Sequence, residues 1–395
     1  MMRLVSQVAA VTWIGLASLP RRAGLSVATV GSVGIVVGVL LGFQSMGTGF
    51  QKTVEGSGSE TVAVITRSGS QSELNSVIGR EQVNLISDAP GIARVGDRPL
   101  VSAELYVVVD AIKKSSNTEV NMPLRGIAAQ GAMVRDNIEI VEGRMFTPGT
   151  TEIVVGQGVL DQFTGFEMGR TVRLGTGTWT VVGVFTAQGT VFDSELWADA
   201  RVVQSQFNRG SSFQTVRAQL ATPGDVSAIE SYIENDPRLR LDVATEKDYF
   251  SAQSSGTVTL INVIAYPISV IMALGALAGA LNTMYTSVAA RARDIATLRA
   301  IGYGGFSAFA GTLAESLLLA LIGGLIGSLV AFVTLDGLSA STLGGSFTQV
   351  VFAFELSPQL IGQGAILALV IGLIGGVFPA WRAARLPVAV AFSNA

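Results

Sequence analysis

Residues 23–43 read AGLSVATVGSVGIVVGVLLGF, a stretch of small and apolar side chains without a single charge. Three later stretches, 251–290, 316–335 and 356–381, are also free of charged residues. Each can cross a hydrocarbon layer of ~30 Å, which takes roughly 20 helical residues. Residues 44–250, between the first stretch and the second, carry most of the chain's charge. We therefore expect a membrane α-helical fold with four transmembrane helices and a large α/β domain inserted between the first and second helices.

The composition limits the kinds of site that the chain can hold. It has no cysteine and no histidine, which excludes disulfides and thiol catalysis and removes the commonest general base and transition-metal ligand. Residues 44–250 carry 18 Lys and Arg against 25 Asp and Glu, a net charge of −7. A negative domain has no general affinity for nucleic acid, so we expect no nucleic-acid partner. Because histidine and cysteine are absent, we also expect no metal site.

The distribution of arginine predicts the orientation in the membrane. Segment 336–355 holds Asp336 and Glu355 but no Lys or Arg. The other short segments hold Arg3, Arg21, Arg22, Arg291, Arg293, Arg299, Arg382 and Arg385. Because basic loops tend to remain in the cytoplasm, both termini and the link 291–305 are expected there. Residues 44–250 are expected on the opposite side, in the periplasm or outside the cell.

The first 43 residues have the features of a retained membrane segment. Their apolar stretch is longer than the core of a cleaved signal peptide, roughly 7–15 residues, and no small-residue cleavage site follows it. We expect residues 1–22 to form an amphipathic helix at the cytoplasmic face. The apolar stretches then delimit transmembrane helix 1 with a stalk at 23–47, an extracytoplasmic domain at 48–250, a stalk with transmembrane helix 2 at 251–290, a cytoplasmic link at 291–305, transmembrane helix 3 at 306–335, a short external loop at 336–355, transmembrane helix 4 at 356–381 and a cytoplasmic tail at 382–395.

The second apolar stretch, 251–290, is longer than a bilayer requires. As one helix it would measure ~60 Å at 1.5 Å per residue. We expect its first half to rise above the membrane as a stalk, with Pro267 bending or loosening the helix partway.

Glycines recur four residues apart in every apolar stretch. Such rows let helix backbones approach closely in lipid, although glycine is also frequent in membrane helices generally. Four rows together favour a tightly packed bundle or a dimer. The pairs are Gly34 and Gly38, Gly275 and Gly279, Gly323 and Gly327, and Gly372 and Gly376.

The inserted domain has the alternating pattern of a mixed α/β fold. Short runs rich in β-branched residues predict strands at 61–66, 104–110, 152–155, 178–185 and 240–244. Helices are predicted at 81–87, 159–163 and 226–234. No catalytic group is recognisable, and the scattered charges, Lys113 and Lys114 among them, are interpreted as a solvated surface. The aromatic residues interpreted as core are Phe163, Phe166, Trp179 and Phe185.

Several segments, in the right order along the chain, resemble MacB/FtsX-type (type VII) ABC transporter permeases. Residues 143–146 (GRMF), 152–163 (EIVVGQGVLDQF) and 169–185 (GRTVRLGTGTWTVVGVF) resemble the family's periplasmic core domain. Residues 290–302 (ARARDIATLRAIG) look like its coupling segment between the second and third membrane helices. Residues 315–327 (ESLLLALIGGLIG) and 379–389 (PAWRAARLPVA) are similar to its third helix and its final tail. The sequence departs from the family pattern at Asp294, where Glu is commoner, and at the tail residues Ala391 and Phe392, which lack the frequent basic neighbour.

The link after the second apolar stretch has the pattern of an amphipathic helix. Ile295, Leu298 and Ile301 recur at helical spacing, with charged residues around the rest. An ordinary basic loop would explain the arginines but not this apolar stripe. The resemblance implies that the apolar side chains enter a groove on an ATPase while the arginines pair with its acidic rim. The candidate coupling residues are Arg291, Arg293, Asp294, Ile295, Leu298, Arg299, Ala300, Ile301 and Gly302.

Glu315 directly precedes the third apolar stretch. An acidic residue at the edge of the membrane costs far less than one at its centre. We interpret Glu315 as a structural residue that accepts a hydrogen bond from Arg299 or from a neighbouring helix. A role in proton relay is the alternative.

The resemblance implies the permease subunit of an ATP-driven exporter that works by mechanotransmission, in which an ATPase moves a periplasmic domain that expels substrate. The sequence contains no G-x-x-x-x-G-K-[ST] motif, so ATP and Mg²⁺ are expected on a separate subunit and no cofactor on this chain. Two alternatives in the same family are a Lol-type permease that extracts lipoproteins and an FtsX-like transducer that regulates a cell-wall hydrolase without transport. An enzyme is disfavoured, because the chain lacks histidine, cysteine and a convincing acid pair.

The same resemblance names the expected partners and location. The partners are a cytoplasmic ABC ATPase, a second permease copy or paralogue in a dimer, membrane lipid and, in some systems, a periplasmic adaptor protein. The expected location is the bacterial cytoplasmic (inner) membrane, with several passes.

Overall fold

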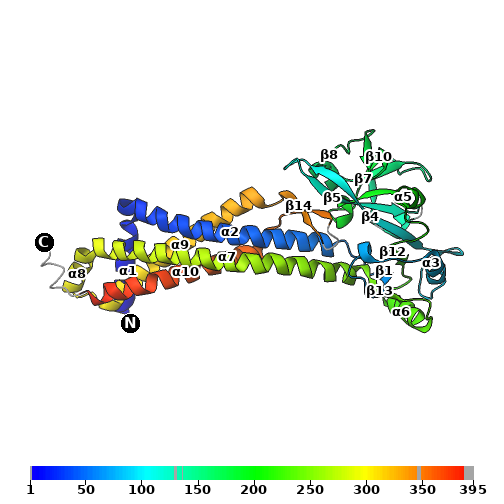
Figure 1. Ribbon diagram of the computed structural model, residues 1–395. Coiled ribbons are helices and arrows are strands. Elements are labelled where there is room, and N and C mark those ends of the chain that lie inside the picture. Colours follow the sequence, from blue (N-terminus) through cyan, green and yellow to red (C-terminus); the bar gives the residue numbers. More distant parts are fainter. Residues whose placement is uncertain (1, 129–130, 136, 345–347, 387–395) are drawn as a thin grey trace. The chain divides into compact units, whose positions relative to one another are not determined.

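The computed structural model describes residues 2–128, 131–135, 137–344 and 348–386 and separates into two compact units (Figure 1). The membrane unit contains Met1–Gly47, Leu260–Leu338 and Glu355–Ala395. The inserted domain contains Thr48–Thr259 and Ser339–Phe354. The predicted tail beyond Leu386, with Ala391 and Phe392, lies outside the described residues.

Four helices in the described part of the chain are long and apolar enough to cross a membrane. They are α2 (Ala23–Glu55), α7 (Glu246–Ala290), α9 (Gly305–Leu335) and α10 (Pro358–Arg385). Helix α1 (Met2–Ala17) and the 3₁₀ helix η1 (Leu19–Arg22) precede them, and α8 (Ala292–Ala300) lies between α7 and α9. The predicted fold class, four membrane helices with an α/β domain after the first, is confirmed.

Helix α7 is longer than the apolar stretch that predicts it. It has 45 residues and continues through Pro267 as one helix, although a proline removes one helical hydrogen bond. Its start is fixed by a reciprocal cap, in which the backbone N of Asp248 donates to Thr245 Oγ1 at 3.1 Å and that hydroxyl donates to Asp248 Oδ2 at 2.7 Å. Glu246 and Asp248 also place negative charge in the first turn, which suits the helix dipole.

The glycine rows of α2 and α9 lie against each other. A Cβ built on Gly34 would be 3.0 Å from the backbone oxygen of Gly323, and one built on Gly38 would be 3.6 Å from that of Gly327. The contact at Gly38 would tolerate a Cβ, but a Cβ built on Gly323 would lie 2.6 Å from the backbone oxygen of Val30, so a side chain there would push the two backbones apart. On α7, by contrast, Gly275 has no described atom within 4 Å of a built Cβ, and Gly279 has only Ser32 Oγ, at 3.8 Å.

The inserted domain is built on an eleven-stranded sheet with strand order β13-β1-β12-β4-β5-β11-β7-β10-β6. Neighbouring strands are antiparallel except for the parallel pairs β5–β11 and β7–β10, with β8 added on β4 and β9 on β10. The strands are β1 (Val62–Arg67), β4 (Val101–Lys113), β5 (Glu119–Ile127), β6 (Glu139–Gly143), β7 (Glu152–Gly156), β8 (Phe163–Thr164), β9 (Thr171–Leu174), β10 (Gly177–Thr186), β11 (Leu196–Asp199), β12 (Thr215–Gln219) and β13 (Leu241–Thr245). A separate two-stranded ribbon pairs β2 (Arg94–Val95) with β3 (Arg98–Pro99).

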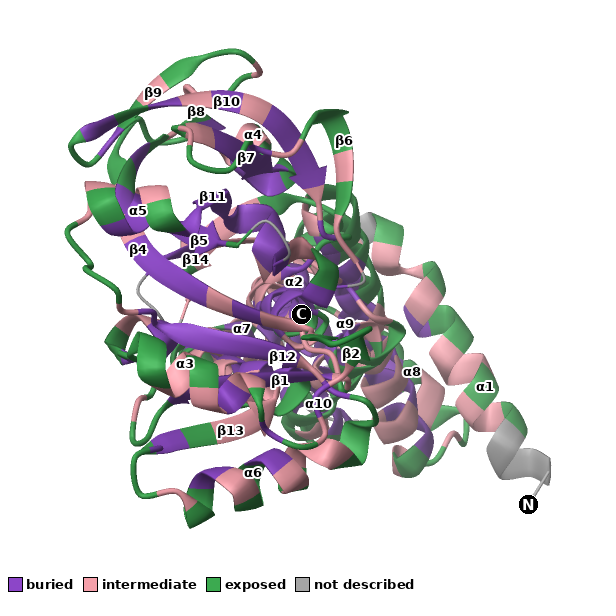
Figure 2. Cartoon of the chain, turned by 90° about the vertical axis from the view of Figure 1, so that its right-hand side faces the viewer, coloured by how far each residue is buried: buried purple, intermediate pink, exposed green. Residues whose placement is uncertain are grey.

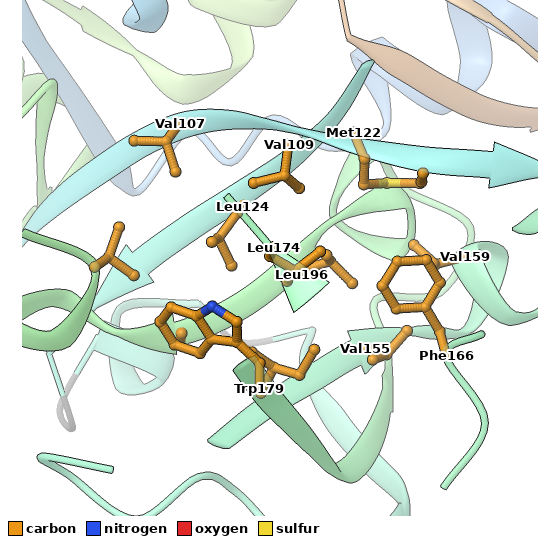
Figure 3. Packing of buried hydrophobic residues seen from close by; sticks show 14 of the residues in the cluster. Val107, Val109, Met122, Leu124, Val155, Val159, Phe166, Leu174, Trp179 and Leu196 are labelled. Carbon is orange, nitrogen blue, oxygen red and sulfur yellow. The ribbon is translucent and has the colours of Figure 1, made fainter. Parts of the chain in front are cut away.

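Two hydrophobic cores flank this sheet. One packs α3 (Arg80–Ser87) and α6 (Val226–Asn235) on β1, β12 and β13. The other joins β4, β5, β7, β10 and β11 to α4 (Gln157–Gln162) and α5 (Ala200–Gln206), and it includes the fully buried Trp179 (Figure 3). Strands β1, β12 and β4 are largely buried, whereas α6 turns an exposed face outward (Figure 2). The predicted strands, helices and core aromatics of the domain are confirmed.

Two features of this region were not predicted. Segment 336–355, expected as a short external loop, contains a hairpin of β14 (Ser339–Leu343) and β15 (Gln349–Ala353), whose residues belong to the inserted domain. The backbone N of Val351 in this hairpin donates to Ser194 Oγ at 2.8 Å. The interpretation of the domain's charges as solvated is wrong for several buried residues, among them seven that pair with one another and are each at most 5% exposed: Glu73, Glu104, Arg125, Arg135, Glu195, Arg217 and Glu246.

Candidate coupling site

Helix α8 is a short, separately capped helix between two long ones. Arg291 occupies its N-cap, with non-helical backbone angles, and Asp294 lies in its first turn while Arg299 lies in its last. This order of charges suits the helix dipole. The helix ends at Ala300 with Ile301 as its C-cap, and the next residue, Gly302, has a φ of +104° that few other residues adopt without strain. Gly304 then caps α9.

The two faces of α8 differ in burial. Ile295 is 6% exposed and packs with Val288, Ala308 and Ala383 of the surrounding helices. Leu298 is half-buried, whereas Ile301 is 69% exposed. The prediction of one exposed apolar stripe is therefore wrong at Ile295, which anchors the helix to the membrane unit. The reason is that α8 lies against α9 and α10, which bury most of its apolar face.

The exposed surface of this region lies at the end of α8 and the turn into α9. Ile301 and Phe306, which is 60% exposed, present large apolar side chains there. Arg293, Asp294 and Ala300 are also exposed. Arg299 is half-buried, and its Nη1 donates to the backbone oxygen of Leu386 at the end of α10.

Glu315 lies within α9, is 1% exposed and accepts a hydrogen bond from Nη2 of Arg291. Nη2 of Arg22 lies 3.5 Å from the same carboxylate, and Ser287 Oγ donates to it at 3.4 Å. The expectation of a neighbouring segment as donor was right, and that of Arg299 was wrong. The Glu315 cluster, defined as Ser18, Arg22, Ser287, Arg291 and Glu315, thus joins η1, α7, α8 and α9.

Helix α1 covers the Glu315 cluster. A Cβ built on Gly15 would lie 3.0 Å from Nη1 of Arg291 and 3.4 Å from Glu315 Oε2. Further along α1, a Cβ built on Gly311 of α9 would lie 2.8 Å from the side chain of Val11. The N-terminal helix therefore packs on α9 and closes the cluster from solvent.

The sequence analysis missed Ser18 and Ser287 and gave Arg22 no role beyond orientation. One signal was available, because Glu315 directly precedes the third apolar stretch, at the end where the neighbouring short segments carry arginines. The cluster pairs the buried carboxylate of Glu315 with Arg22 and Arg291, and through Arg291 it fixes the position of α8. Among the described residues, no group of three or more Asp or Glu side chains could hold a metal ion.

Comparison with known proteins covers both units. Residues 26–236 match the profile of the MacB-like periplasmic core domain, and residues 267–388 match that of the FtsX-like permease C-terminal region. The chain belongs to the MacB/FtsX-like family of ABC transporter permeases. The predicted resemblance is thereby confirmed, and α8 with the Glu315 cluster lies mostly in the part that the FtsX-like permease profile covers.

Individual relatives of this MacB/FtsX-like permease are distant. The macrolide export ATP-binding/permease protein MacB of Sodalis glossinidius is 27% identical over an alignment of 340 positions, which covers 78% of this chain and 48% of that protein. The ABC transporter permease YknZ of Bacillus subtilis is 24% identical over an alignment of 377 positions, which covers 90% of each chain. The chain thus spans about half the length of this MacB relative and most of YknZ. The crystal structure of the periplasmic region of MacB from Actinobacillus actinomycetemcomitans is 15% identical, with a TM-score of 0.37 over 49% of this chain and 92% of that one.

Proposed function

We propose that this permease is the transmembrane subunit of an ATP-driven exporter that works by mechanotransmission. In this proposal a cytoplasmic ABC ATPase binds the α8–α9 turn, ATP-driven movement of that turn displaces the membrane helices, and the inserted domain moves on the other side of the membrane to expel substrate. Both termini would be cytoplasmic and the protein would lie in the bacterial inner membrane. ATP and Mg²⁺ would bind to the ATPase, since these 395 residues contain no P-loop motif.

The observation that carries the proposal is the exposure of Ile301 at the end of a helix whose other face is anchored. A partner that pushes or pulls needs a rigid point of contact, and Ile295 supplies the rigidity by packing between helices. Ile301 and Phe306 supply apolar side chains that an ATPase groove can bury. Arg293, exposed on the same helix, can pair with acidic residues at the rim of that groove.

The Glu315 cluster supports the same role. Arg291 is at once the N-cap of α8 and a partner of Glu315 in α9. A buried ion pair with a hydrogen bond has a narrow range of geometries. Force applied to α8 would therefore displace α7 and α9 instead of flexing the link between them.

The decisive experiment measures ATPase stimulation. The full chain is purified from native membranes, the co-purifying ATPase is identified by its P-loop, and both are reconstituted in liposomes. Ile301→Asp should abolish the stimulation of ATP hydrolysis by the permease, whereas Ile301→Leu should retain it, with equal membrane insertion of both variants. Full stimulation by Ile301→Asp, or the absence of any ATPase in the purified complex, would contradict the proposal.

The co-purifying proteins also distinguish the two alternatives within the family. A lipoprotein carrier bound to the complex would indicate extraction of lipoproteins, and a peptidoglycan hydrolase would indicate an FtsX-like transducer. A periplasmic adaptor would support export. The inferred exporter role predicts the third outcome, together with a second permease copy or paralogue in the complex.

A further inference from the structure

Seven of the buried charged residues of the inserted domain form one connected group. We call them the ion network: Glu73, Glu104, Arg125, Arg135, Glu195, Arg217 and Glu246. Removing a charge from water is costly unless it is paired and hydrogen-bonded. A network of this size in a domain that also has two apolar cores therefore calls for an explanation beyond stability.

Glu104, in the central strand β4, is the hub of the network. Its carboxylate accepts hydrogen bonds from Arg125 at 3.0 Å, from Arg217 at 2.8 Å and from Arg135 at 2.8 Å to each oxygen. Burial by itself would raise the pKa of Glu104, but the guanidiniums of Arg135, Arg217 and Arg125 outweigh it and hold that pKa well below its usual range. The hub therefore stays ionised at physiological pH, and strands β4, β5 and β12 are tied together.

The first residues of α7 extend into this network. Nε of Arg217 donates to Glu246 Oε1 at 2.9 Å, and the backbone N of Glu73 donates to the hydroxyl of Tyr249 at 3.0 Å. The next residue, Phe250, packs edge-on against Phe192 with ring centroids 5.9 Å apart. Three of the first five residues of α7 are thus bound to the network or to the ring beside it.

The ring of Phe192 lies close to all three guanidiniums of the ion network. The centroid of Phe192 lies 4.8 Å from the guanidinium of Arg135, 5.6 Å from that of Arg217 and 5.8 Å from that of Arg125. These distances lie within the range of cation–π attraction. Helix α7 therefore contacts the network by an ion pair, a hydrogen bond and an aromatic contact.

Two further segments contact residues beside the ion network, and each is adjacent in sequence to a candidate membrane helix: the β14–β15 hairpin precedes α10, and Ser57 follows α2. In the hairpin before α10, Thr348 Oγ1 lies 2.8 Å from the hydroxyl of Tyr106, whose ring centroid is 5.0 Å from the guanidinium of Arg125. Just after α2, Ser57 Oγ accepts from the backbone N of Val191 at 2.8 Å, next to Phe192. A cavity of about 40 Å³, enough for a few water molecules, lies where these segments meet, lined in part by Phe50, Tyr106, Tyr249 and Gln349.

We infer that the ion network is the joint that fixes α7, the end of α2 and the β14–β15 hairpin to the central strands of the inserted domain. The inference rests on the proposed function, because a joint matters in a protein that transmits movement. Apolar contacts can slide, whereas hydrogen-bonded ion pairs have fixed directions. A displacement of α7 would therefore move β4, β5 and β12 with it. Glu246, Arg217 and Tyr249 are the positioning residues of this joint.

The first test needs neither nucleotide nor partner. Amide hydrogen exchange is measured on the full chain in lipid nanodiscs, for the wild type and for Glu246→Gln, which removes the charge at nearly constant shape. The amides of the first two turns of α7 should exchange at least about tenfold faster in the variant, because their opening no longer breaks a buried ion pair. The amides of β10, which lies outside the network, should be unchanged.

A matched control lies one residue further along the helix. Lys247 pairs with Glu60 at 2.5 Å, and both side chains are more than half exposed, so Lys247→Gln should leave the exchange unchanged. Equal exchange in Glu246→Gln and Lys247→Gln would overturn the inference. If Glu246→Gln does not fold, Tyr249→Phe removes only the hydroxyl that accepts from Glu73, and it should speed exchange at the same amides by a smaller factor. Unchanged exchange in Tyr249→Phe would then overturn the inference.

A second readout separates a joint from a merely stabilising network. With the co-purified ATPase, Glu246→Gln should keep the permease's stimulation of ATP hydrolysis but lose the ATP-dependent change in exchange of β12 and β4 that the wild type shows. If the network only stabilises the domain, Glu246→Gln should either lose both the stimulation of ATP hydrolysis and the ATP-dependent change in exchange or keep both. Either result would contradict the inference that the network is a joint. If the wild type stimulates no ATPase, the proposed function fails while the exchange result without nucleotide still stands.

Discussion

Gly327 of α9 lies so close to Gly34 of α2 that a Cβ built on it would be 2.2 Å from the backbone oxygen of Gly34. Oxygen and carbon do not approach to that distance, so the two helices depend on glycine here. Gly327→Ala should push α2 and α9 apart and destabilise the membrane unit by about 1–3 kcal/mol, the usual cost of overpacking. Thermal unfolding of the purified protein in detergent measures the loss.

The control for that substitution is Gly275→Ala on α7. A Cβ at Gly275 meets no described atom within 4 Å, so the variant should unfold at the wild-type temperature or slightly above it, because alanine favours a helix over glycine. Equal destabilisation by the two substitutions would show that α2 and α9 do not pack through Gly34 and Gly327.

The different burial of Ile295 and Ile301 predicts that the same substitution destabilises the protein at the first position and hardly affects it at the second. Ile295→Ala removes a side chain that is 6% exposed and should cost about 2–5 kcal/mol of stability. Ile301→Ala removes one that is 69% exposed and should change stability by less than about 0.5 kcal/mol. Thermal unfolding of both variants in detergent tests the assignment of Ile295 to the core, and comparable losses would refute it.

The proposed orientation can be tested by labelling, because the chain has no cysteine. Thr297→Cys, exposed on α8, should react with a membrane-impermeant maleimide only after the cells are opened. Ser116→Cys, exposed in the inserted domain, should react from the outer face of the cytoplasmic membrane. The reverse pattern would place the inserted domain in the cytoplasm and exclude the proposed ATPase contact at Ile301.

The pair of Arg144 and Glu152 predicts a pH dependence of stability. The hydrogen bond from Arg144, 2.6 Å from Glu152 Oε1, lowers the pKa of Glu152 from 4.5 to about 2 in the folded protein. A lowered folded pKa means that the stabilisation is complete above pH 4.5 and is lost as the pH falls toward 2. The difference in unfolding temperature between wild type and Glu152→Gln should therefore be constant from neutral pH to about pH 5 and shrink below it. A difference that grows on acidification would contradict this sign.

Much of the fold was predictable because local patterns and long-range packing agree. The run at 178–185 predicts β10, and its Trp179 is a fully buried member of the larger core. Strand β12 was missed because Arg217 interrupts its apolar pattern, and that arginine is buried only through partners from β4, η2 (Glu73–Asn75) and α7. The attachment of the β14–β15 hairpin to the inserted domain was missed because the residues that it contacts there lie more than 150 positions earlier in the sequence.

For the candidate site, periodicity located α8 correctly but could not say which of its apolar residues was exposed. Ile295 and Ile301 are equivalent in a helical pattern, and only the packing of α8 against Val288, Ala308 and Ala383 separates them. The same limit applied to Glu315, whose position at a membrane edge indicated a structural acid but not the choice of Arg291 over Arg299.

The sequence by itself determined the membrane helices, the inserted domain and the family, because each depends on the order and local periodicity of residues. Tertiary structure alone decided which charges are buried. Glu104 and Arg217 resemble any other acidic and basic residue in the sequence, and they become an ion network only when β4 and β12 pair and α7 brings Glu246 to them. The physical reason is that burial and pairing of a charge depend on the whole surrounding structure, whereas an apolar stretch of membrane length is recognisable from its own residues.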